Sequence, residues 1–143
     1  MTGIYQHTID AKGRLFIPAR LREELGNKFH VTVSIDTSSK KKCLAAYSKE
    51  SWERYDEKIN MMPRAKQNKY RVFFSRADEC VLDGQGRILL VQLLRDWADL
   101  KKDVTVVGAG GCVEFWDSET WAAIDAMEAT PENIAALFEE LDF

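Results

Sequence analysis

The sequence predicts an α+β fold in which two half-folds, encoded by two copies of one unit, share a single core. The main observation is a repeat within the 143 residues: Asp10-Ala11-Lys12-Gly13-Arg14 returns 73 positions later as Asp83-Gly84-Gln85-Gly86-Arg87. A second observation is that residues 31–33 and 104–106 are both Val-Thr-Val at the same offset. A third is size, because a unit of roughly 70 residues buries only a limited core alone. Two copies are too few for a solenoid, so we expect an intramolecular pseudo-dimer.

The register of the two copies continues at an offset of 69 after a longer loop in the first copy. There Tyr47 matches Trp116 and Trp52 matches Trp121, and we expect the matched tryptophans to anchor the core. The chain therefore divides into a first copy at residues 4–52, a helical linker at 53–76, a second copy at 77–121 and a C-terminal acidic helical tail at 122–143.

Each copy is predicted to run strand, turn, strand, helix, strand, strand, and then to enter a further helix. The expected elements of the first copy are strands at 5–9 and 14–17, a helix from Pro18 to Gly26, strands at 29–35 and 43–47, and a helix to about residue 61. Proline at the first turn and glycine after the last are typical helix boundaries. We expect Ser48 to cap the helix that follows the first copy, and Asp117 to cap its equivalent after the second.

Two more helices are expected outside the repeat. Residues 63–74 start with a proline and carry several basic side chains, and we interpret them as a helix that links the copies. A C-terminal helix opens at Thr130 and Pro131. Its apolar side chains recur at helical spacing, which predicts packing within the chain or between subunits. They are Ile134, Leu137, Phe138 and Leu141.

The charge of the chain is unevenly distributed. The net charge is −3, but nine acidic residues and no basic one follow position 113, so residues 1–113 hold 20 basic residues against 14 acidic ones. This asymmetry predicts a basic working surface and an acidic tail, although solvated faces on both parts would give the same counts. No signal peptide or membrane-spanning run is recognisable, and the three cysteines fit a reducing compartment. We therefore expect a cytoplasmic protein.

Catalytic and metal-binding patterns are poorly supported. The two histidines, His7 and His30, lie in no ligand spacing, and the cysteines form no Cys-x-x-Cys pair, so we expect Cys43, Cys80 and Cys112 to be small core residues. No nucleophile elbow, Walker loop or dinucleotide fingerprint occurs. We predict a protein that is not an enzyme and uses no cofactor, metal or small-molecule substrate.

The repeated Asp-x-x-x-Arg motif is the strongest candidate site. It places Asp10 and Arg14, and likewise Asp83 and Arg87, at the two ends of a turn. A charge-assisted hydrogen bond, within a copy or across to the other copy, would hold each arginine there. An ion pair that only fixes the geometry between the halves is the competing interpretation.

The surroundings of the two turns differ in charge. The first carries Lys12 where the second has Gln85, and the second copy adds several acidic residues around its turn. If one copy binds a polyanion, we expect it to be the first. The predicted DNA contacts are Lys12, Arg14, Arg20 and Arg22. The residues predicted to hold the motif and the assembly are Asp10, Asp83 and Arg87.

Together these features resemble the MraZ family. The resemblance rests on the doubled turn and on residues 14–22 and 71–75, and it covers nearly the whole chain. It implies a tandem SpoVT/AbrB-like swapped-hairpin β-barrel, a pseudo-dimer with flanking helices, in a ring-shaped homo-oligomer. It also implies a nucleoid-associated regulator that binds G-rich direct repeats in double-stranded DNA upstream of its own operon, at the head of the division and cell wall gene cluster. Lys12 and Arg14 match the DNA-facing residues of the family's first motif.

Two other functions compete with this one. An AbrB-type antitoxin or transition-state regulator would use the same fold and bind a protein partner through the acidic tail. A hydrolase or metal enzyme would need a nucleophile or a ligand set, and the sequence offers neither.

Overall fold

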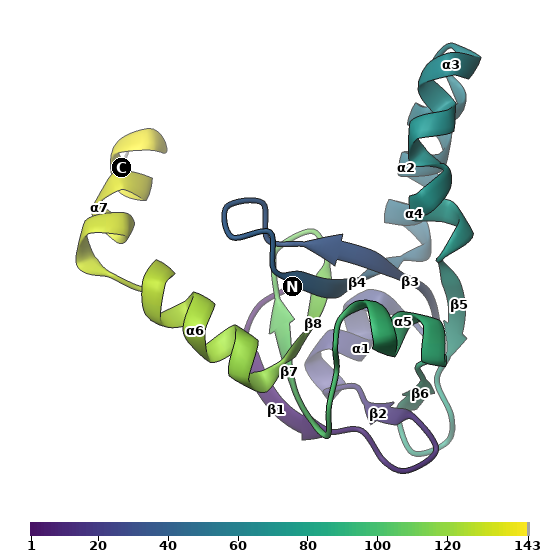
Figure 1. Cartoon of the computed structure of the whole chain (residues 1–143), viewed down its shortest axis with the longest axis horizontal. Helices are drawn as coiled ribbons and strands as arrows, with labels where there is room; N and C mark the ends of the chain where they lie inside the picture. Colours follow the sequence, from purple (N-terminus) through teal and green to yellow (C-terminus); the bar gives the residue numbers. More distant parts are fainter. Residues whose placement is uncertain (143) are drawn as a thin grey trace.

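A computed structural model describes residues 1–142 and confirms the α+β class (Figure 1). The strands are β1 (Ile4–Thr8), β2 (Arg14–Phe16), β3 (Lys28–Ile35), β4 (Lys42–Ser48), β5 (Asp78–Val81), β6 (Arg87–Leu89), β7 (Asp103–Gly108) and β8 (Val113–Asp117). The helices are α1 (Ala19–Leu25), α2 (Lys49–Asn60), α3 (Arg64–Gln67), the 3-10 turn η1 (Asn68–Tyr70), α4 (Arg71–Ser75), α5 (Gln92–Trp97), α6 (Ser118–Glu128) and α7 (Pro131–Glu140). The predicted order of strands and helices is present in both copies.

The strands of the two copies pair with each other rather than only among themselves. Six strands form one antiparallel sheet in the order β1-β7-β8-β4-β3-β5, and β2 pairs with β6 in a separate ribbon. The first strand of each copy therefore lies beside the third strand of the other: β1 pairs with β7, and β5 pairs with β3. The halves also meet through β4 and β8. Neither copy can form this sheet without its partner.

The core draws equivalent side chains from both copies. Leu15 and Ile88, which match in the repeat, are both buried on the inner face of the β2–β6 ribbon. Leu21 of α1 and Leu94 of α5 are buried in the same cluster. Each such side chain contributes about 1.5–3 kcal/mol on burial. Because side chains alternate along a strand, burying Leu15 and Ile88 turns Arg14 and its ribbon neighbours outward.

The helix boundaries follow the predicted signals with one exception. Pro18 directly precedes α1, and Gly26 ends it with a φ of 83°. Ser48 caps α2, since its Oγ accepts a hydrogen bond from the Ser51 N–H at 3.3 Å. Asp117 holds the equivalent position before α6, but the prediction that its side chain caps the helix is wrong. Its buried carboxylate lies 3.6 Å from the Lys101 ammonium instead.

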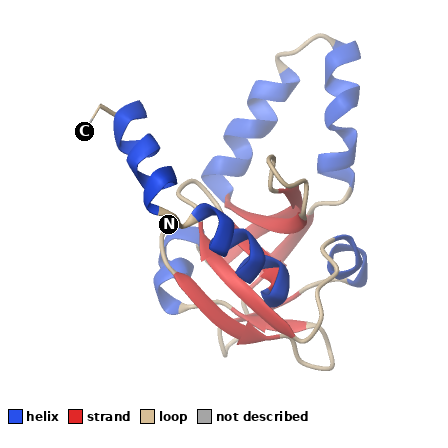
Figure 2. Ribbon diagram, turned by 60° about the vertical axis from the view of Figure 1, so that its left-hand side comes forward, coloured by secondary structure: helices blue, strands red, loops and turns tan. Residues whose placement is uncertain are grey.

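Two helical arms project from the strands on opposite sides (Figure 2). The predicted linking helix is present, broken into α3, η1 and α4, and it folds back along α2 as a hairpin. Aromatic rings hold this hairpin to the sheet: Trp52 lies parallel to Phe73 at 5.2 Å and to His30 at 4.5 Å between ring centroids. The matched Trp121 packs against Trp116 in the second copy. Within residues 1–142, no helix has the length and apolarity needed to cross a membrane.

The second arm consists of α6 and α7. The predicted apolar stripe of α7 is present, but it is not buried within the described chain. The side chains of the stripe are 44–64% exposed, at Ile134, Leu137, Phe138 and Leu141.

Candidate nucleic-acid interface

The two Asp-x-x-x-Arg segments form tight turns with the same backbone geometry. In the first, the Asp10 N–H donates to the Arg14 carbonyl at 3.0 Å, and the Gly13 N–H donates to the Asp10 carbonyl at 3.0 Å. The second repeats both bonds at 2.9 and 3.1 Å. Both turns close on a glycine with positive φ, 86° at Gly13 and 76° at Gly86, where a side chain would be strained.

Each aspartate holds its arginine by backbone and side chain together. Asp10 Oδ1 accepts from the backbone N–H groups of Lys12 and Arg14 at 2.9 Å, and Oδ2 accepts from Arg14 Nε at 2.7 Å. Asp83 makes the same three bonds, with Arg87 Nε at 3.0 Å. The hydrogen bond from the Arg14 backbone N–H is the largest cause that lowers the pKa of Asp10, and the bond from the Arg14 guanidinium adds to it. Together they bring this pKa to about 2. The pKa of Asp83 is lowered by the equivalent bonds. Both carboxylates are therefore charged at neutral pH.

The ribbon sets the two turns side by side. Arg14 lies opposite Leu89 and Phe16 opposite Arg87 in the antiparallel register. The Ile17 N–H donates to Gly86, and the Leu90 N–H donates to Gly13, both at 2.9 Å. The sequence left open whether each arginine pairs within its own copy or across to the other, and both pairings occur. Beyond the bonds within each turn, Arg87 Nη1 lies 3.9 Å from Asp10 Oδ2 of the other copy. Arg87 thus faces two carboxylates, whereas Arg14 pairs with one.

Behind each turn lies an arginine from the helix of the other copy. The sequence expectation grouped Arg22 with the first turn, but its guanidinium contacts Gly86 of the second. Its Cζ also lies 5.2 Å from the centre of the Phe16 ring. Arg95, the repeat equivalent of Arg22, lies against Gly13 and donates from Nε to the Leu90 carbonyl at 2.9 Å. Strand exchange between the copies explains this crossed arrangement.

The remaining predicted contacts are accessible. Lys12 at the tip of the first turn and Arg20 on α1 are exposed, and the Arg14 side chain is one-third exposed. Arg22 is half-buried, and its buried Nε has no hydrogen-bond partner among the described residues. The site therefore brings together Asp10, Lys12, Arg14, Asp83 and Arg87, with Arg22 placed behind the second turn. Arg95 was missed as a site residue, although its match to Arg22 at the motif's own offset was a usable signal.

The cysteines are mostly packing residues, as predicted. Cys43 and Cys80 are buried, whereas Cys112 is partly exposed. Burial raises the thiol pKa of Cys43 and Cys80 to about 12 and that of Cys112 to about 11, so all three are protonated at neutral pH. Over residues 1–142, no group of three or more histidine, cysteine or acidic side chains is arranged to hold a metal ion.

The chain is a pseudo-dimeric α+β protein. Its two repeated halves share one core, and each presents an arginine held by a carboxylate on the β-ribbon. The family described as "MraZ protein, putative antitoxin-like" matches this chain twice, over residues 1–72 and 73–139. The chain belongs to the MraZ family.

Curated relatives match over nearly the full length. The "Transcriptional regulator MraZ" of Heliobacterium modesticaldum is 46% identical over 142 residues, which cover 97% of this chain and 92% of the relative. The proteins of the same name from Carboxydothermus hydrogenoformans and Halothermothrix orenii are 48% and 39% identical. These alignments cover 83% and 97% of this chain, and 82% and 96% of the relatives.

Proposed function

We propose that this protein is a sequence-specific DNA-binding transcription regulator that contacts bases through its first turn. The observation that carries the proposal is the way Arg14 is held. Asp10 engages Nε, while the terminal nitrogens Nη1 and Nη2 have no hydrogen-bond partner among the described residues. Those two nitrogens form the fork that binds guanine O6 and N7. The arginine is thus oriented before DNA arrives, which lowers the entropic cost of binding.

The surroundings of Arg14 suit the major groove. A two-stranded β-ribbon fits in this groove, which is about 12 Å wide. Lys12 lies exposed at the tip of the turn, where an ammonium group would neutralise a phosphate, and Arg20 on α1 is a second candidate. Asp10, Asp83 and Arg87 hold the paired turns. A DNA contact by Arg22 stays a prediction, and its place behind Gly86 favours a supporting role.

The family supplies the finer expectations. Its curated members carry the name transcriptional regulator. We propose that the exchanged pairing of β1 and β5 corresponds to the SpoVT/AbrB-like swapped-hairpin barrel of the family. We also propose a cytoplasmic, nucleoid-associated protein that binds G-rich direct repeats upstream of its own operon, in the division and cell wall gene cluster.

The internal repeat favours a ring. An ordinary dimeric repressor relates two chains by a two-fold axis and binds a palindrome. Here the pseudo-two-fold relates halves of one chain that differ in charge, and we propose that chains associate through unlike surfaces, head to tail. Such association closes into a ring if the rotation allows it. First turns around the ring then share one orientation and would contact direct repeats about 10–10.5 base pairs apart.

A footprint on the DNA upstream of the protein's own gene tests this function. We expect protection of repeats in one orientation, spaced by one helical turn. Inserting about half a turn between two repeats should weaken binding far more than inserting a full turn, which is the matched control. Protection of a single palindrome, or equal tolerance of both insertions, would show that the ring argument is wrong.

An antitoxin-like regulator with a protein partner is the second candidate. The family description includes the words antitoxin-like, and the apolar side chains of α7 are exposed. Purification of the tagged chain from its own organism distinguishes the candidates. A stoichiometric unrelated protein that elutes with the chain, and whose removal restores or abolishes DNA binding, would favour this function.

A further inference from the structure

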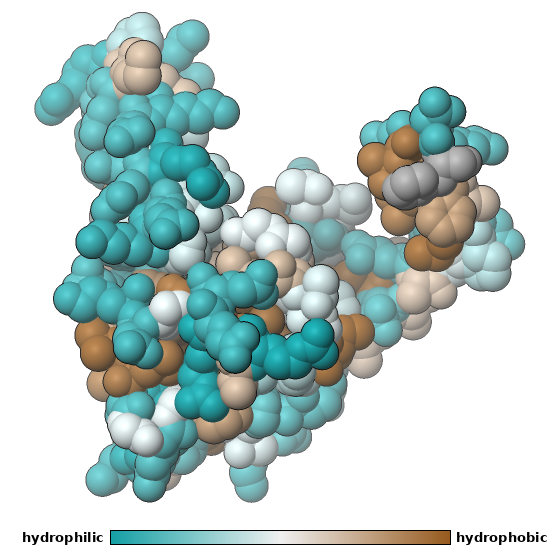
Figure 3. Space-filling model, turned by 180° about the vertical axis from the view of Figure 1, so that it is seen from behind, coloured by the Kyte–Doolittle hydropathy of each residue, from teal (hydrophilic) through white to brown (hydrophobic). Residues whose placement is uncertain are grey.

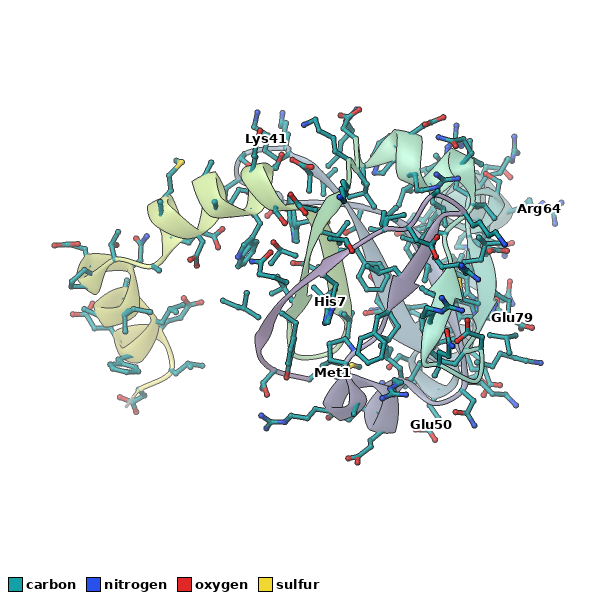
Figure 4. All side chains as sticks on the ribbon, turned by 90° about the horizontal axis from the view of Figure 1, so that it is seen from below. Met1, His7, Lys41, Glu50, Arg64 and Glu79 are labelled. Atoms are coloured by element: carbon teal, nitrogen blue, oxygen red, sulfur yellow. The ribbon has the colours of Figure 1, made fainter. Side chains whose placement is uncertain are left out.

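The molecule carries two helical arms of opposite charge on opposite flanks. We call residues 64–76, which include α3, η1 and α4, the basic arm, and residues 129–142, which include α7, the acidic arm. The basic arm has five basic residues and no acidic one, and the acidic arm has four acidic residues and no basic one. Figure 4 shows Arg64 of the basic arm on the flank opposite to the C-terminal helix. Among the described residues, none of these nine charges forms an ion pair.

Both arms also expose apolar side chains. On the acidic arm, Ile134, Leu137 and Leu141 recur at the spacing of one helix face and are 44%, 50% and 64% exposed. Figure 3 shows brown, hydrophobic atoms on the C-terminal arm, away from the body of the molecule. On the basic arm, Tyr70 and Val72 are 37% and 48% exposed. A ten-residue helix is marginal in water unless its apolar face is packed.

We infer that the acidic arm of one chain docks, apolar face inward, on the basic arm of a second copy. The inference rests on the self-association proposed above and names the surfaces that make it. Two acidic arms repel each other, as do two basic arms, so a self-complementary contact between like arms is disfavoured. The contact between unlike arms is favoured by charge and covers apolar surface on both sides.

The position of the arms then determines the assembly. Because the two arms lie on opposite flanks, each copy uses one arm toward each neighbour (Figure 1). A contact between unlike surfaces is heterologous, and repeating it produces a ring or a filament rather than a closed dimer. The arms stand clear of the β2–β6 ribbon, so the paired turns of every copy stay accessible in such an assembly.

Two single substitutions, one on each arm, test the contact. Leu137→Asp places a charge in the apolar face of the acidic arm, and Val72→Asp does the same on the basic arm. We expect each variant alone to be monomeric by multi-angle light scattering at a concentration where the unchanged chain is assembled. Mixed in equal amounts, they should form a dimer and nothing larger, because each variant keeps one intact arm. Ala136→Asp, on the opposite face of α7, is the matched control and should assemble like the unchanged chain.

The outcomes separate the possible occupants of the apolar face. If the Leu137→Asp variant assembles normally and still binds operator DNA, this inference is overturned and the proposed function stands. A dimer of the Val72→Asp variant alone would indicate pairing between two acidic arms, and a mixture that stays monomeric would exclude a contact between the arms. An unchanged chain that is monomeric at every concentration would remove the proposed ring itself. Far-ultraviolet circular dichroism and a thermal melt establish that both variants are folded.

Discussion

The two turns of this protein have nearly one geometry and two different charge environments. The hydrogen bonds that hold Arg14 to Asp10 and Arg87 to Asp83 agree to within a few tenths of an ångström. Lys12 in the first turn is nevertheless replaced by Gln85 in the second, and Arg87 faces an additional carboxylate. The backbone of the turn is therefore the same in both halves, while the charge around its arginine is not. The shared geometry joins the two halves, and under the proposed function the unshared charges would select the half that binds DNA.

Removing each arginine in turn gives the largest expected effect. We expect Arg14→Ala to abolish specific DNA binding with little loss of stability, since a lost bidentate guanine contact costs about 1–3 kcal/mol per site. The loss is multiplied when several subunits bind together. Arg87→Ala removes the contacts with Asp83 and Asp10 that join the two turns, so it should loosen the pseudo-dimer that carries the arms and disturb assembly more than base contact. Gel-shift affinity and light scattering measure the two properties, and Arg54→Ala on α2 is the charge-matched control.

The opposite ranking would reverse the roles assigned to the two turns. If the Arg87→Ala protein stays assembled but no longer binds the operator, the second turn contacts DNA as well. Unchanged operator affinity in the Arg14→Ala protein would remove the first turn as the contact surface.

The two glycines test whether geometry and function are separable. Both Gly13→Ala and Gly86→Ala force alanine into a left-handed conformation, which costs about 1–2 kcal/mol. The new methyl groups would also meet the guanidinium of Arg95 and of Arg22, respectively. We expect similar losses of unfolding free energy in urea, but a clear loss of DNA affinity only for Gly13→Ala. Equal losses of DNA affinity would mean that distorting either turn also distorts the other.

Exchanging the residues at the turn tips should have a smaller effect. Lys12→Gln removes one phosphate contact, so the slope of log affinity against log salt should become shallower by roughly 0.9. Gln85→Lys should leave both slope and affinity nearly unchanged if the second turn faces away from DNA. A filter-binding titration at several salt concentrations measures both variants. A steeper slope for Gln85→Lys would show that the second turn also lies near phosphate.

Most of the local structure was predictable from the sequence because the signals are local. The repeat located both turns, and Pro18, Gly26 and Ser48 marked their helix boundaries correctly. Contacts between copies were not predictable in the same way. Arg22 lies close in sequence to the first turn but packs on Gly86 of the second, since strand pairing decides which helix lies behind which turn.

The side-chain cap predicted for Asp117 failed for a related reason. A cap depends on which way one side chain turns, and the Lys101 ammonium lies within reach of this carboxylate. Equivalent positions of the repeat thus share a backbone path without sharing every side-chain contact. The apolar stripe of α7 was predictable as a pattern, but the sequence left open whether the chain itself or another copy covers it.

The smallest expected effect concerns the stability of the two turns in acid. The bonds from Arg14 hold the pKa of Asp10 at about 2, below the ordinary value of 3.8. A depressed pKa means that the charged carboxylate stabilises the folded protein above about pH 4, and that this stabilisation is lost as the pH falls toward 2. Asp10→Asn keeps an oxygen for the backbone N–H groups but removes the charge. We therefore expect it to lower stability at neutral pH and to flatten the fall in stability between about pH 4 and 2.

Asp83→Asn is the matched comparison. Asp83 makes the same bonds to its own turn, but it lacks the second guanidinium that Arg87 brings to within 3.9 Å of Asp10. Asp83→Asn should therefore have a smaller effect on the acid limb, which is the fall in stability between about pH 4 and 2. Urea unfolding at a series of pH values measures this fall. If the two variants lose equal stability and show the same acid limb, the contact between the turns contributes nothing. Asp10 would then belong to the first turn alone, and the ion pair across the halves would play no part in holding them together.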